Sequence, residues 1–389
     1  MKSIKPSKNS FDTYAEVDLK VLKKNFELIG KEANRIRKNP RKRTMICSVV
    51  KANAYGHGMC NVAEALHNFG SEYLGTAYLS ESIELRKHLD RRGKKTARIL
   101  CLGLLRDKKK YFEEVLKNRI EVTLSDVKAA KTLDKFASSL NKKVNVHIKL
   151  DTGMNRIGFT PDVAIEAVRE ISKLKNLNLK GIYSHFATSE VPGSSFAKSQ
   201  LKTFVELVSE IENNAAKFEL KHIENSGGIL NFRNDFCNMV RPGIALYGYY
   251  PDRTKLKKNI GIQPVMTLKS KVSLVKTVGR GESVSYGRKY YTKGVTKIAS
   301  IPVGYGDGYS RLLTNKSKVY INGGLYKVVG TVCMDWIMAD IGKNSDINEQ
   351  NEVILFGKEY PAHNLSDIMQ TIPYEIITNV SSRVQRIYV

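Results

Sequence analysis

The strongest constraint on the fold is a regular alternation of short apolar runs with segments of helical spacing, which continues as far as Tyr247. Short apolar runs are typical of buried strands, and intervening helices are the usual connections of parallel strands. Eight such runs are present, at Met45–Val50, Tyr73–Tyr78, Ala97–Leu102, Ile120–Leu124, Val144–Leu150, Gly181–Phe186, His222–Asn225 and Met239–Tyr247. Eight strand–helix repeats predict a (β/α)8 barrel of the TIM type. An open doubly wound sheet is the alternative, but no G-x-G-x-x-G fingerprint follows any of these runs.

Helical segments accompany these runs. We expect helices at Leu19–Ala33, Val62–Phe69, Glu81–Leu89, Tyr111–Lys117, Val127–Leu140, Pro161–Leu174 and Phe196–Phe218. Ser125, shortly before Val127, and Pro161, directly after Thr160, are helix-start signals.

The pattern changes after the basic, proline-started linker Pro251–Lys258. Runs rich in valine, threonine, isoleucine and tyrosine then recur at Met266–Val278, Thr296–Val303, Lys318–Ile321, Tyr326–Val332, Trp336–Asp340 and Glu352–Phe356. They predict a second, mostly antiparallel β-domain. Because 389 residues exceed one comfortable core, we expect a loose basic tail at 1–11, a barrel at 12–250 and a C-terminal β-domain at 251–389. A first strand at 12–18 could pair with the β-domain.

The charge balance is strongly basic, with 64 Lys and Arg against 38 Asp and Glu and a net charge of +26. The basic residues are scattered as pairs and triplets, without a dense block that contains interleaved aromatics, so we expect neither a nucleic-acid nor a membrane partner. No stretch has the apolar length of a membrane span, and the first ten residues do not resemble a secretory signal. We therefore expect a cytoplasmic protein.

Five cysteines, at 47, 60, 101, 237 and 333, are odd in number and lack CxxC spacing. Neither a disulfide framework nor a metal site is indicated, and free thiols fit a reducing compartment. Cys47 and Cys101 lie inside apolar runs, where cysteine is usually a small core residue.

The first apolar run, Met45–Val50, leads directly into Lys51 and a glycine-containing turn. An ammonium surrounded by apolar chain loses solvation, so its pKa falls and the neutral amine can react with an aldehyde cofactor. A strand-end lysine that simply extends into water is the other interpretation of this stretch alone.

Further polar groups follow the ends of other predicted strands, at the face where barrel enzymes place their sites. They are Tyr55 after the first strand, Lys149 and 151–156 at the fifth, 183–185 at the sixth, 225–228 after the seventh and 241–244 in the eighth. Ser226 and the amides around Gly243 and Ile244 could cradle a phosphate. His185 could contact a cofactor ring and Arg241 its ring nitrogen. Each also has an ordinary interpretation, as a core histidine, an ion-paired arginine or a helix cap.

Several stretches resemble the bacterial alanine racemase family, whose members are pyridoxal 5'-phosphate (PLP) enzymes built as a (β/α)8 barrel followed by a β-domain. In family order they are 50–58, 147–158, 183–186, 225–226, 241–248, 285–288, 304–308, 332–335 and 374–376, and the similarity extends from about Asp12 to the C-terminus. The resemblance implies PLP as the cofactor, an amino-acid substrate and a homodimer.

Racemisation removes a proton from one face of a planar carbanion and returns one to the other, so two acid/base groups suit it best. The resemblance implies that Lys51 is one and that Tyr286, reaching the site from the other subunit, is the second. Because tyrosine ordinarily titrates near ~10, its pKa must be lowered or its proton shared, and Arg156 is a candidate for helping.

By the same resemblance, Arg156 contacts the cofactor's phenolic oxygen and the substrate carboxylate. A carbamylated Lys149 would pair with Arg156, because carbamylation converts a repelling ammonium into an anion. The Met334 amide of the other subunit binds the substrate carboxylate, and Tyr305 narrows the entrance.

Arg241 opposite the ring nitrogen disfavours protonation of that nitrogen, which weakens the electron sink and discourages side reactions. The resemblance assigns the cofactor's remaining contacts to Tyr55, His185, Asn225, Ser226, Gly243, Ile244 and Tyr374. Two departures concern loop geometry and the entrance: Asn155 stands where glycine is common, and Trp336 follows the 333–335 motif.

We expect interconversion of L- and D-alanine that supplies D-alanine for peptidoglycan. A racemase of serine or of a broader set of amino acids would keep the same residues. A same-fold decarboxylase would need a glycine-rich phosphate loop that is missing here, and a non-catalytic PLP-binding barrel would not need the β-domain. A nucleic-acid binder rests on charge alone.

Overall fold

The structure is a computed structural model that describes residues 12–36, 43–255 and 258–389. The described residues form two compact units: a barrel unit within residues 23–54 and 59–262, and a C-terminal unit of residues 263–389 that also contains residues 12–22 and 55–58. The predicted tail at 1–11 and part of the predicted linker, 256–257, lie outside the described residues. Within the described ranges, no helix is long and apolar enough to cross a membrane.

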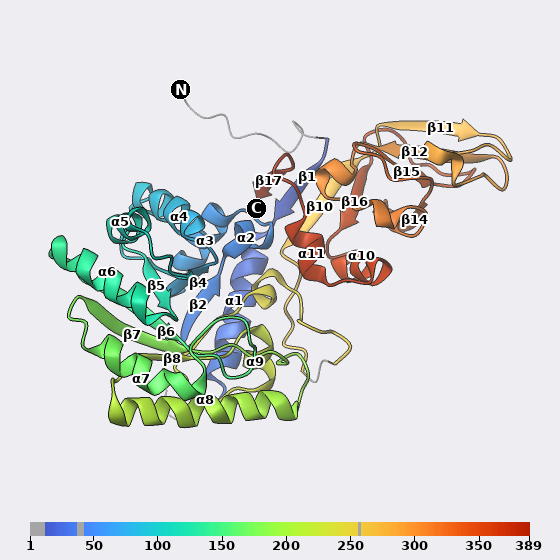
Figure 1. The fold of residues 1–389 in the computed structure, drawn as a ribbon. Coiled ribbons are helices and arrows are strands. Elements are labelled where there is room, and N and C mark those ends of the chain that lie inside the picture. Colours follow the sequence, from blue (N-terminus) through green and yellow to red (C-terminus); the bar gives the residue numbers. More distant parts are fainter. Residues whose placement is uncertain (1–11, 37–42, 256–257) are drawn as a thin grey trace. The chain divides into compact units, whose positions relative to one another are not determined.

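The barrel unit contains an eight-stranded parallel sheet in the part of the chain that the structure describes (Figure 1). Its order is β8 (Leu220–His222), β7 (Leu177–Tyr183), β6 (Val144–Lys149), β5 (Glu121–Leu124), β4 (Arg98–Leu104), β3 (Tyr73–Thr76), β2 (Met45–Val49) and β9 (Met239–Val240). The edge strands β8 and β9 are joined by hydrogen bonds from the Asn238 amide to the Lys221 carbonyl (3.0 Å) and from the Arg241 amide to the Glu224 carbonyl (2.9 Å). The predicted (β/α)8 barrel is therefore confirmed.

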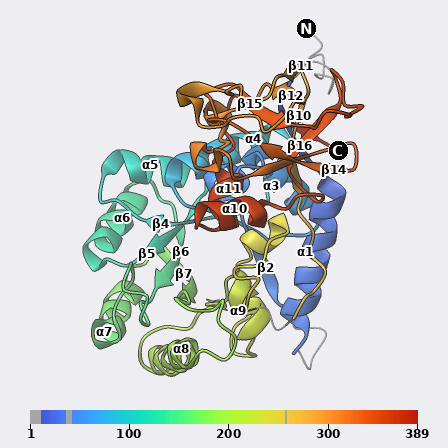
Figure 2. The same cartoon turned by 90° about the vertical axis from the view of Figure 1, so that its right-hand side faces the viewer.

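Helices alternate with these strands. They are α1 (Leu19–Asn34), α2 (Lys51–Tyr55), α3 (Met59–Asn68), α4 (Leu79–Arg91), α5 (Lys109–Lys117), α6 (Val127–Ser139), α7 (Pro161–Ser172), α8 (Ser195–Asn214) and α9 (Ser226–Asn231). Figure 2 shows α5, α6 and α7 on the outer side of β5, β6 and β7. Pro161 occupies the first turn of α7, as predicted, but α6 is capped by Asp126, whose side chain accepts from the Ala129 amide at 2.6 Å, and not by Ser125.

The eighth predicted strand is mostly wrong. Only Met239–Val240 form a strand, and Ile244–Tyr247 form a 3-10 helix, η2. Pro242 lacks the amide that a strand ladder requires, and Gly248 ends η2 with a φ of 89°.

The barrel interior contains an apolar cluster of side chains from five strands. Its members are Cys47, Tyr73, Leu100, Leu220 and Met239, all fully buried. Cys101 is also buried, so Cys47 and Cys101 are the core residues that the sequence predicts, and all five cysteines are free.

The C-terminal unit contains a nine-stranded, mostly antiparallel sheet within the described residues, which confirms the predicted fold class. Its order is β11 (Leu274–Val278), β12 (Thr296–Ile301), β15 (Ile337–Asp340), β14 (Gly324–Val328), β13 (Lys318–Ile321), β16 (Glu352–Phe356), β10 (Met266–Lys271), β1 (Tyr14–Val17) and β17 (Gln385–Tyr388). β1 pairs with β10 in antiparallel register, Tyr14 opposite Lys269, and with β17 in parallel.

Short helical elements in this unit were not predicted. They are α10 (Ala362–Met369), α11 (Pro373–Thr378), η3 (Tyr286–Arg288), η4 (Tyr305–Asp307) and η5 (Arg311–Leu313). Each is too short to show several periods of helical spacing, so sequence periodicity gives little signal for them.

Candidate active site

The turn after β2 is left-handed. Ala52, Asn53, Ala54 and Tyr55 have φ of 51°, 54°, 53° and 52°, so α2 is a left-handed turn. Left-handed backbone costs an L-residue roughly 1–2 kcal/mol, and such strain persists only where the surroundings impose it. The sequence predicts a glycine-containing turn here but not its left-handed conformation, since neither alanine nor tyrosine favours that conformation.

One carboxylate side chain, that of Glu81, and one amide side chain, that of Asn53, stabilise the turn that begins at Lys51. Glu81 of α4 accepts from the Ala52 amide and the Ala77 amide, both at 2.7 Å, and Asn53 accepts from the Met59 amide at 2.8 Å. These bonds fix the backbone directly after Lys51 at the end of its strand.

Lys51 is half-buried at the C-terminal end of β2. Burial and then the positive charge of Arg156 lower its pKa, against an opposing effect of Glu81. A lowered pKa favours the neutral amine, which is the form that reacts with an aldehyde.

The loop after β6 is organised by Asp151. One carboxylate oxygen accepts from the amides of Gly153 (2.9 Å), Met154 (2.9 Å) and Asn155 (3.1 Å), and the other from the Arg156 amide (3.0 Å). Burial raises the pKa of Asp151, but these hydrogen bonds and Lys149 outweigh it and the pKa is lowered overall. Asn155 has a φ of 55°, a conformation that asparagine tolerates better than most other side chains.

Lys149, at the end of β6, is buried, and its ammonium donates to the Leu150 carbonyl at 2.6 Å. It also lies 5.4 Å from the centre of the Tyr183 ring. Burial, followed by the charges of Arg241 and Arg156, lowers its pKa to about 7, although Asp151 opposes the shift.

Arg241 is buried among acceptors. Its guanidinium contacts His222 Nδ1 at 2.6 Å, the Ser184 carbonyl at 2.7 Å, and the Ile223 carbonyl and His185 Nδ1 at 3.2 Å each. These bonds hold the cation in one orientation inside the barrel.

A chain of buried polar groups continues from Arg241 through the barrel. His222 Nε2 lies 3.2 Å from His147 Nδ1, and His147 Nε2 lies 2.9 Å from Glu121. Because Arg241 can only donate, His222 Nδ1 must accept, and the proton on His222 Nε2 is then donated to His147. His147 donates its own proton to Glu121. Each ring nitrogen of His222 and His147 that donates therefore faces an acceptor, and each that accepts faces a donor.

Both histidines that contact Arg241, His185 and His222, are held neutral. Burial and then the charge of Arg241 lower their pKa values well below 6.5. Gly181 makes the arrangement possible, because a Cβ at that position would lie 2.3 Å from His147 Nδ1.

Ser226, at the start of α9, lies where backbone amides converge. Its hydroxyl accepts from the Gly243 amide at 3.0 Å and the Ala245 amide at 3.3 Å, on either side of Ile244. Asn225 caps α9 by accepting from the Gly228 amide at 2.9 Å, and its own amide lies 3.4 Å from His185 Nε2. Convergent amides beside a hydroxyl are typical of phosphate sites.

Tyr55 and Tyr374 meet within the C-terminal unit, with ring centroids 6.0 Å apart. Tyr55 is buried, and burial raises its pKa. Gly56, next to Tyr55, is required by close packing in the same unit, because its φ is 84° and a Cβ would lie 2.0 Å from the Ile377 carbonyl oxygen. The family resemblance assigned Tyr55 and Tyr374 to the same cofactor, but nothing in the sequence linked Gly56 with Ile377.

The remaining predicted residues lie together on the surface of the C-terminal unit. Tyr286, Met334 and Tyr305 are 71%, 52% and 44% exposed, and Trp336 is 43% exposed. We call these four residues the exposed cluster.

Hydrogen bonds connect the segments that carry the exposed cluster. The Tyr305 amide donates to the Cys333 carbonyl (3.0 Å), and the Cys333 amide donates to the Trp336 carbonyl (2.9 Å). The side-chain hydroxyl of Ser285, a residue with a φ of 67°, donates to the Thr331 carbonyl at 2.6 Å, and the Thr331 hydroxyl donates to the Tyr286 carbonyl at 2.7 Å. The segments around Tyr286, Tyr305 and Met334 are therefore one surface.

The barrel unit brings a second set together, which we call the barrel cluster: Lys51, Lys149, Arg156, His185, Asn225, Ser226, Arg241, Gly243 and Ile244. Sequence reasoning missed its supporting residues Glu121, His147 and His222. The sequence contained one indication of their role: they are polar side chains within apolar strands, and buried polar side chains require hydrogen-bond partners. Among the described residues, no group of His, Cys, Asp and Glu could hold a metal ion.

Comparisons with known proteins cover nearly the whole chain. Residues 17–251 match the family described as Alanine racemase, N-terminal domain, and residues 265–388 match Alanine racemase, C-terminal domain. A protein of Clostridium perfringens named alanine racemase is 40% identical over 384 residues, 96% of this chain and 95% of that protein. A protein of Methanococcus maripaludis with the same name is 38% identical over 387 residues, 97% of this chain and 99% of that one.

Solved structures agree with these matches. The alanine racemase of Clostridium difficile 630 has a TM-score of 0.88 and 36% identity, covering 97% of this chain and 96% of its own. The alanine racemase of Bartonella henselae, solved with covalently bound pyridoxal phosphate, has a TM-score of 0.84 and 27% identity, covering 97% and 100%. The chain belongs to the alanine racemase family.

Proposed function

We propose that this protein interconverts L- and D-alanine with PLP as its cofactor and a proton-transferring group on each side of the substrate. The observation that carries the proposal is the barrel cluster, in which a lysine of lowered pKa, Lys51, shares one strand-end face with the fixed cation Arg241. Family membership and the covalent pyridoxal phosphate of the Bartonella henselae relative support it.

The residues present fit the cofactor. Ser226 and the amides of Gly243 and Ile244 would hold the phosphate, together with Tyr55 and Tyr374. In support, the amides on either side of Ile244, those of Gly243 and Ala245, converge on the Ser226 hydroxyl. Asn225 and His185 would contact the remainder of the cofactor. When bound, PLP joins an amino group through its aldehyde and delocalises the negative charge that develops at the substrate's α-carbon.

Lys51 would hold the cofactor and move a proton at Nζ on one side of the substrate. Its lowered pKa favours the neutral amine, which can accept a proton, and the left-handed turn fixes the backbone behind it. Tyr286 of a second subunit would move the other proton at its hydroxyl oxygen.

Arg241 would face the cofactor's ring nitrogen. A guanidinium stays protonated and has no acceptor, so it disfavours a proton on a nitrogen next to it. The acceptors around Arg241 keep the cation in place, and this arrangement favours racemisation over reactions that need a stronger electron sink.

Arg156 would bind the substrate carboxylate together with the Met334 amide of the second subunit, and Tyr305 would narrow the entrance. We include a carbamylated Lys149 in the proposal. Carbon dioxide reacts only with a neutral amine, and a pKa of about 7 leaves a large neutral fraction at neutral pH. The product is an anion, whose charge the nearby cations Arg156 and Arg241 would stabilise, and the reaction releases one proton.

The same proposal includes a homodimer, a cytoplasmic location and a supply of D-alanine for peptidoglycan. The exposed cluster supports the dimer, because exposed apolar and aromatic side chains that gather on one surface are typical of an interface.

The test measures loss of optical activity by circular dichroism for each of a panel of L- and D-amino acids, with PLP-saturated protein. We expect turnover of alanine in both directions, and much slower turnover of serine and larger amino acids. Lys51→Ala is the control and should lose both the activity and the absorbance of covalently bound PLP. A pure protein that gains no absorbance with PLP and leaves alanine unchanged would refute the proposal.

A further inference from the structure

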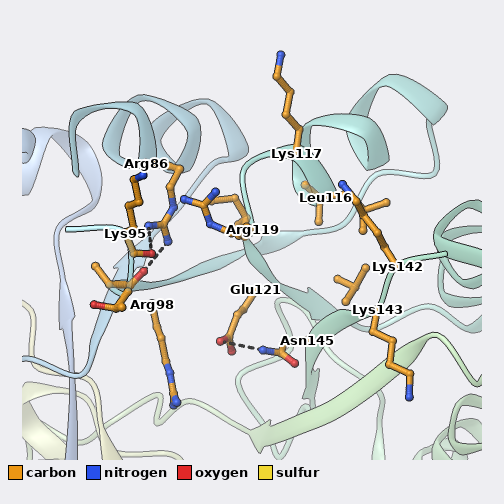
Figure 3. Close-up of a pocket in the computed structure, with 15 residues that line it drawn as sticks. Arg86, Lys95, Arg98, Leu116, Lys117, Arg119, Glu121, Lys142, Lys143 and Asn145 are labelled. Atoms are coloured by element: carbon orange, nitrogen blue, oxygen red, sulfur yellow. Dashed lines mark hydrogen bonds between the residues drawn. The ribbon is translucent and has the colours of Figure 1, made fainter. Parts of the chain in front are cut away.

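A pocket lies at the N-terminal ends of barrel strands, whereas Lys51 and Arg241 follow the C-terminal ends of their strands. Figure 3 shows the side chains that line it. It lies where β4, β5 and β6 begin, beside the ends of α4 and α5, and has a volume of about 570 Å³. Its lining includes Arg98 at the start of β4, Glu121 at the start of β5 and Val144 at the start of β6. This volume is in the range of small-molecule sites.

The lining is strongly basic. Its cationic residues are Arg86, Lys95, Arg98, Lys117, Arg119, Lys142 and Lys143, and its only carboxylate among the described residues is that of Glu121. That carboxylate already accepts from His147 at 2.9 Å and from Asn145 at 3.3 Å. A single engaged carboxylate leaves most of the positive charge of the pocket uncompensated.

Most of these cations are not used by other ion pairs. Asp90 pairs with Arg119 at 2.7 Å and with Arg86 at 3.6 Å. Within the described part of the chain, Lys95, Lys117, Lys142 and Lys143 form no ion pair. The lysines of the pocket are therefore available to an external anion.

Arg86 fixes two of the loops that carry these cations. It is buried, and its guanidinium donates to the Asn118 carbonyl at 3.2 Å and to the Lys95 carbonyl at 3.4 Å. The loop before β4 and the loop before β5 are thereby held together, so part of the basic rim is formed before any ligand arrives.

Figure 3 shows how the cations lie around the pocket. Arg86 and Arg119, which share Asp90, form one edge, and Lys142 extends from the other side toward Leu116. Lys117 and Lys143 extend outward in opposite directions. Cations on more than one side suit an anion with several charged groups.

We propose that this pocket binds a small polyanion with two or more linked phosphate groups. Lysine ammonium groups are compact point charges that suit phosphate, and arginine adds paired donors. Among the described residues of the lining none is aromatic, so the pocket offers no stacking surface for a nucleobase, and recognition rests on the phosphates.

The test uses PLP-saturated protein, so that the cofactor's phosphate site is filled. Titration calorimetry with sodium tripolyphosphate at constant ionic strength measures the affinity of wild type, Lys142→Glu and Lys198→Glu. Lys198 is an exposed lysine on α8, outside the pocket. Lys198→Glu therefore changes the net charge as much as Lys142→Glu does, without changing the pocket. We expect Lys142→Glu to weaken binding about tenfold or more, because it removes a charge-assisted contact, and Lys198→Glu to change it less than about twofold.

ATP and a short single-stranded RNA are further arms of the experiment. ATP that binds as tightly as tripolyphosphate identifies the phosphates as the recognised group, and tighter ATP binding assigns a nucleotide to the same site, provided that Lys142→Glu weakens it too. Equal weakening by both substitutions would overturn the proposal in favour of diffuse surface charge. Undetectable tripolyphosphate binding, or RNA binding that is stronger and insensitive to Lys142→Glu, would overturn it as well.

Discussion

The barrel cluster and the exposed cluster differ in how completely one chain builds them. In the barrel cluster, Arg241 and Lys149 are buried and hydrogen-bonded, and a chain of histidines supports Arg241. In the exposed cluster, Tyr286 and Met334 present more than half of their surface to solvent. The barrel unit therefore builds its cluster from its own buried residues, whereas Tyr286, the proposed second proton-transferring group, is exposed and would need another surface to act upon.

The largest expected effect is on alanine racemisation, when a variant of the barrel cluster is mixed with a variant of the exposed cluster. Lys51→Ala and Tyr286→Phe should each lower alanine racemisation by at least about 10²-fold, because each removes one acid/base group. If Tyr286 serves a neighbouring subunit, equal mixtures of the two inactive variants should recover about a quarter of the wild-type sites, since half of the dimers are mixed and each holds one intact site. Circular dichroism of alanine after subunit exchange measures the recovery.

The control for the mixing experiment is the double variant Lys51→Ala, Tyr286→Phe, which should give no recovery with either single variant. Exchange itself is followed with a tag on one partner. Demonstrated exchange without recovery would mean that Tyr286 acts in its own chain or has no catalytic role.

The second prediction asks whether the barrel cluster needs a group beyond the protein's own atoms, namely a carbamate on Lys149. We expect a carbamate at Lys149, visible as a carbon-13 carbonyl signal after incubation with labelled bicarbonate and absent from Lys149→Ala. Lys149→Ala should raise KM for alanine about tenfold, with a smaller effect on kcat, because Arg156 loses a charged partner.

Bicarbonate removal sharpens this prediction. Wild type in carbon-dioxide-free buffer should shift toward the KM of Lys149→Ala and return when bicarbonate is added, while Lys149→Ala should not respond. A wild-type protein without the labelled signal, and with a KM equal to that of the variant, would contradict the assignment.

The same contrast explains what the sequence could and could not predict. The barrel follows from eight apolar runs because burial on both faces of a parallel sheet leaves an unmistakable pattern. Lys51, Arg241 and Ser226 could be found because strand ends of a barrel share one face. The eighth strand was overextended, since the apolar residues of Ile244–Tyr247 are buried equally well in a 3-10 helix.

Other features have no local signal. The left-handed turn at Ala52–Tyr55 is imposed by Glu81 and by packing, and the residues themselves do not favour it. The hydrogen bonds from Glu121 through His147 and His222 join three separate strands, so only the closed barrel reveals them. Site residues in the C-terminal unit came from family resemblance, because an exposed tyrosine has no distinctive pattern.

Acid should weaken the barrel unit through its neutral histidines. His185 and His222 have pKa values well below 6.5 in the folded state, so below pH 6.5 only the unfolded chain takes up their protons. The free energy of unfolding should therefore fall as pH decreases from 6.5, by up to about 1.4 kcal/mol per pH unit for each histidine. Around His222, the facing groups are Arg241, His147, Tyr183 and Lys149.

Urea unfolding between pH 7.5 and pH 5 measures this slope, in a range where most carboxylates stay ionised. His222→Asn should be less stable at pH 7.5 and should lose one histidine's share of the slope. If the unfolding free energy of the variant depends on pH as steeply as that of wild type, His222 is not held neutral.

The smallest expected effect concerns the left-handed turn behind Lys51. Ala52 is exposed with a φ of 51°, so Ala52→Gly should relieve roughly 1–2 kcal/mol of backbone strain in the folded state. Glycine also raises the conformational entropy of the unfolded chain, which lowers the unfolding free energy by about 0.4–1 kcal/mol. We expect a net gain of about 0.5 kcal/mol in unfolding free energy, and a kcat about threefold lower because Lys51 is held less firmly. Ala52→Val should instead lose stability, since a β-branched residue fits this conformation poorly. Opposite signs for the two substitutions would show that strain is maintained at the proposed catalytic lysine, whereas a destabilising glycine would contradict a left-handed turn in solution.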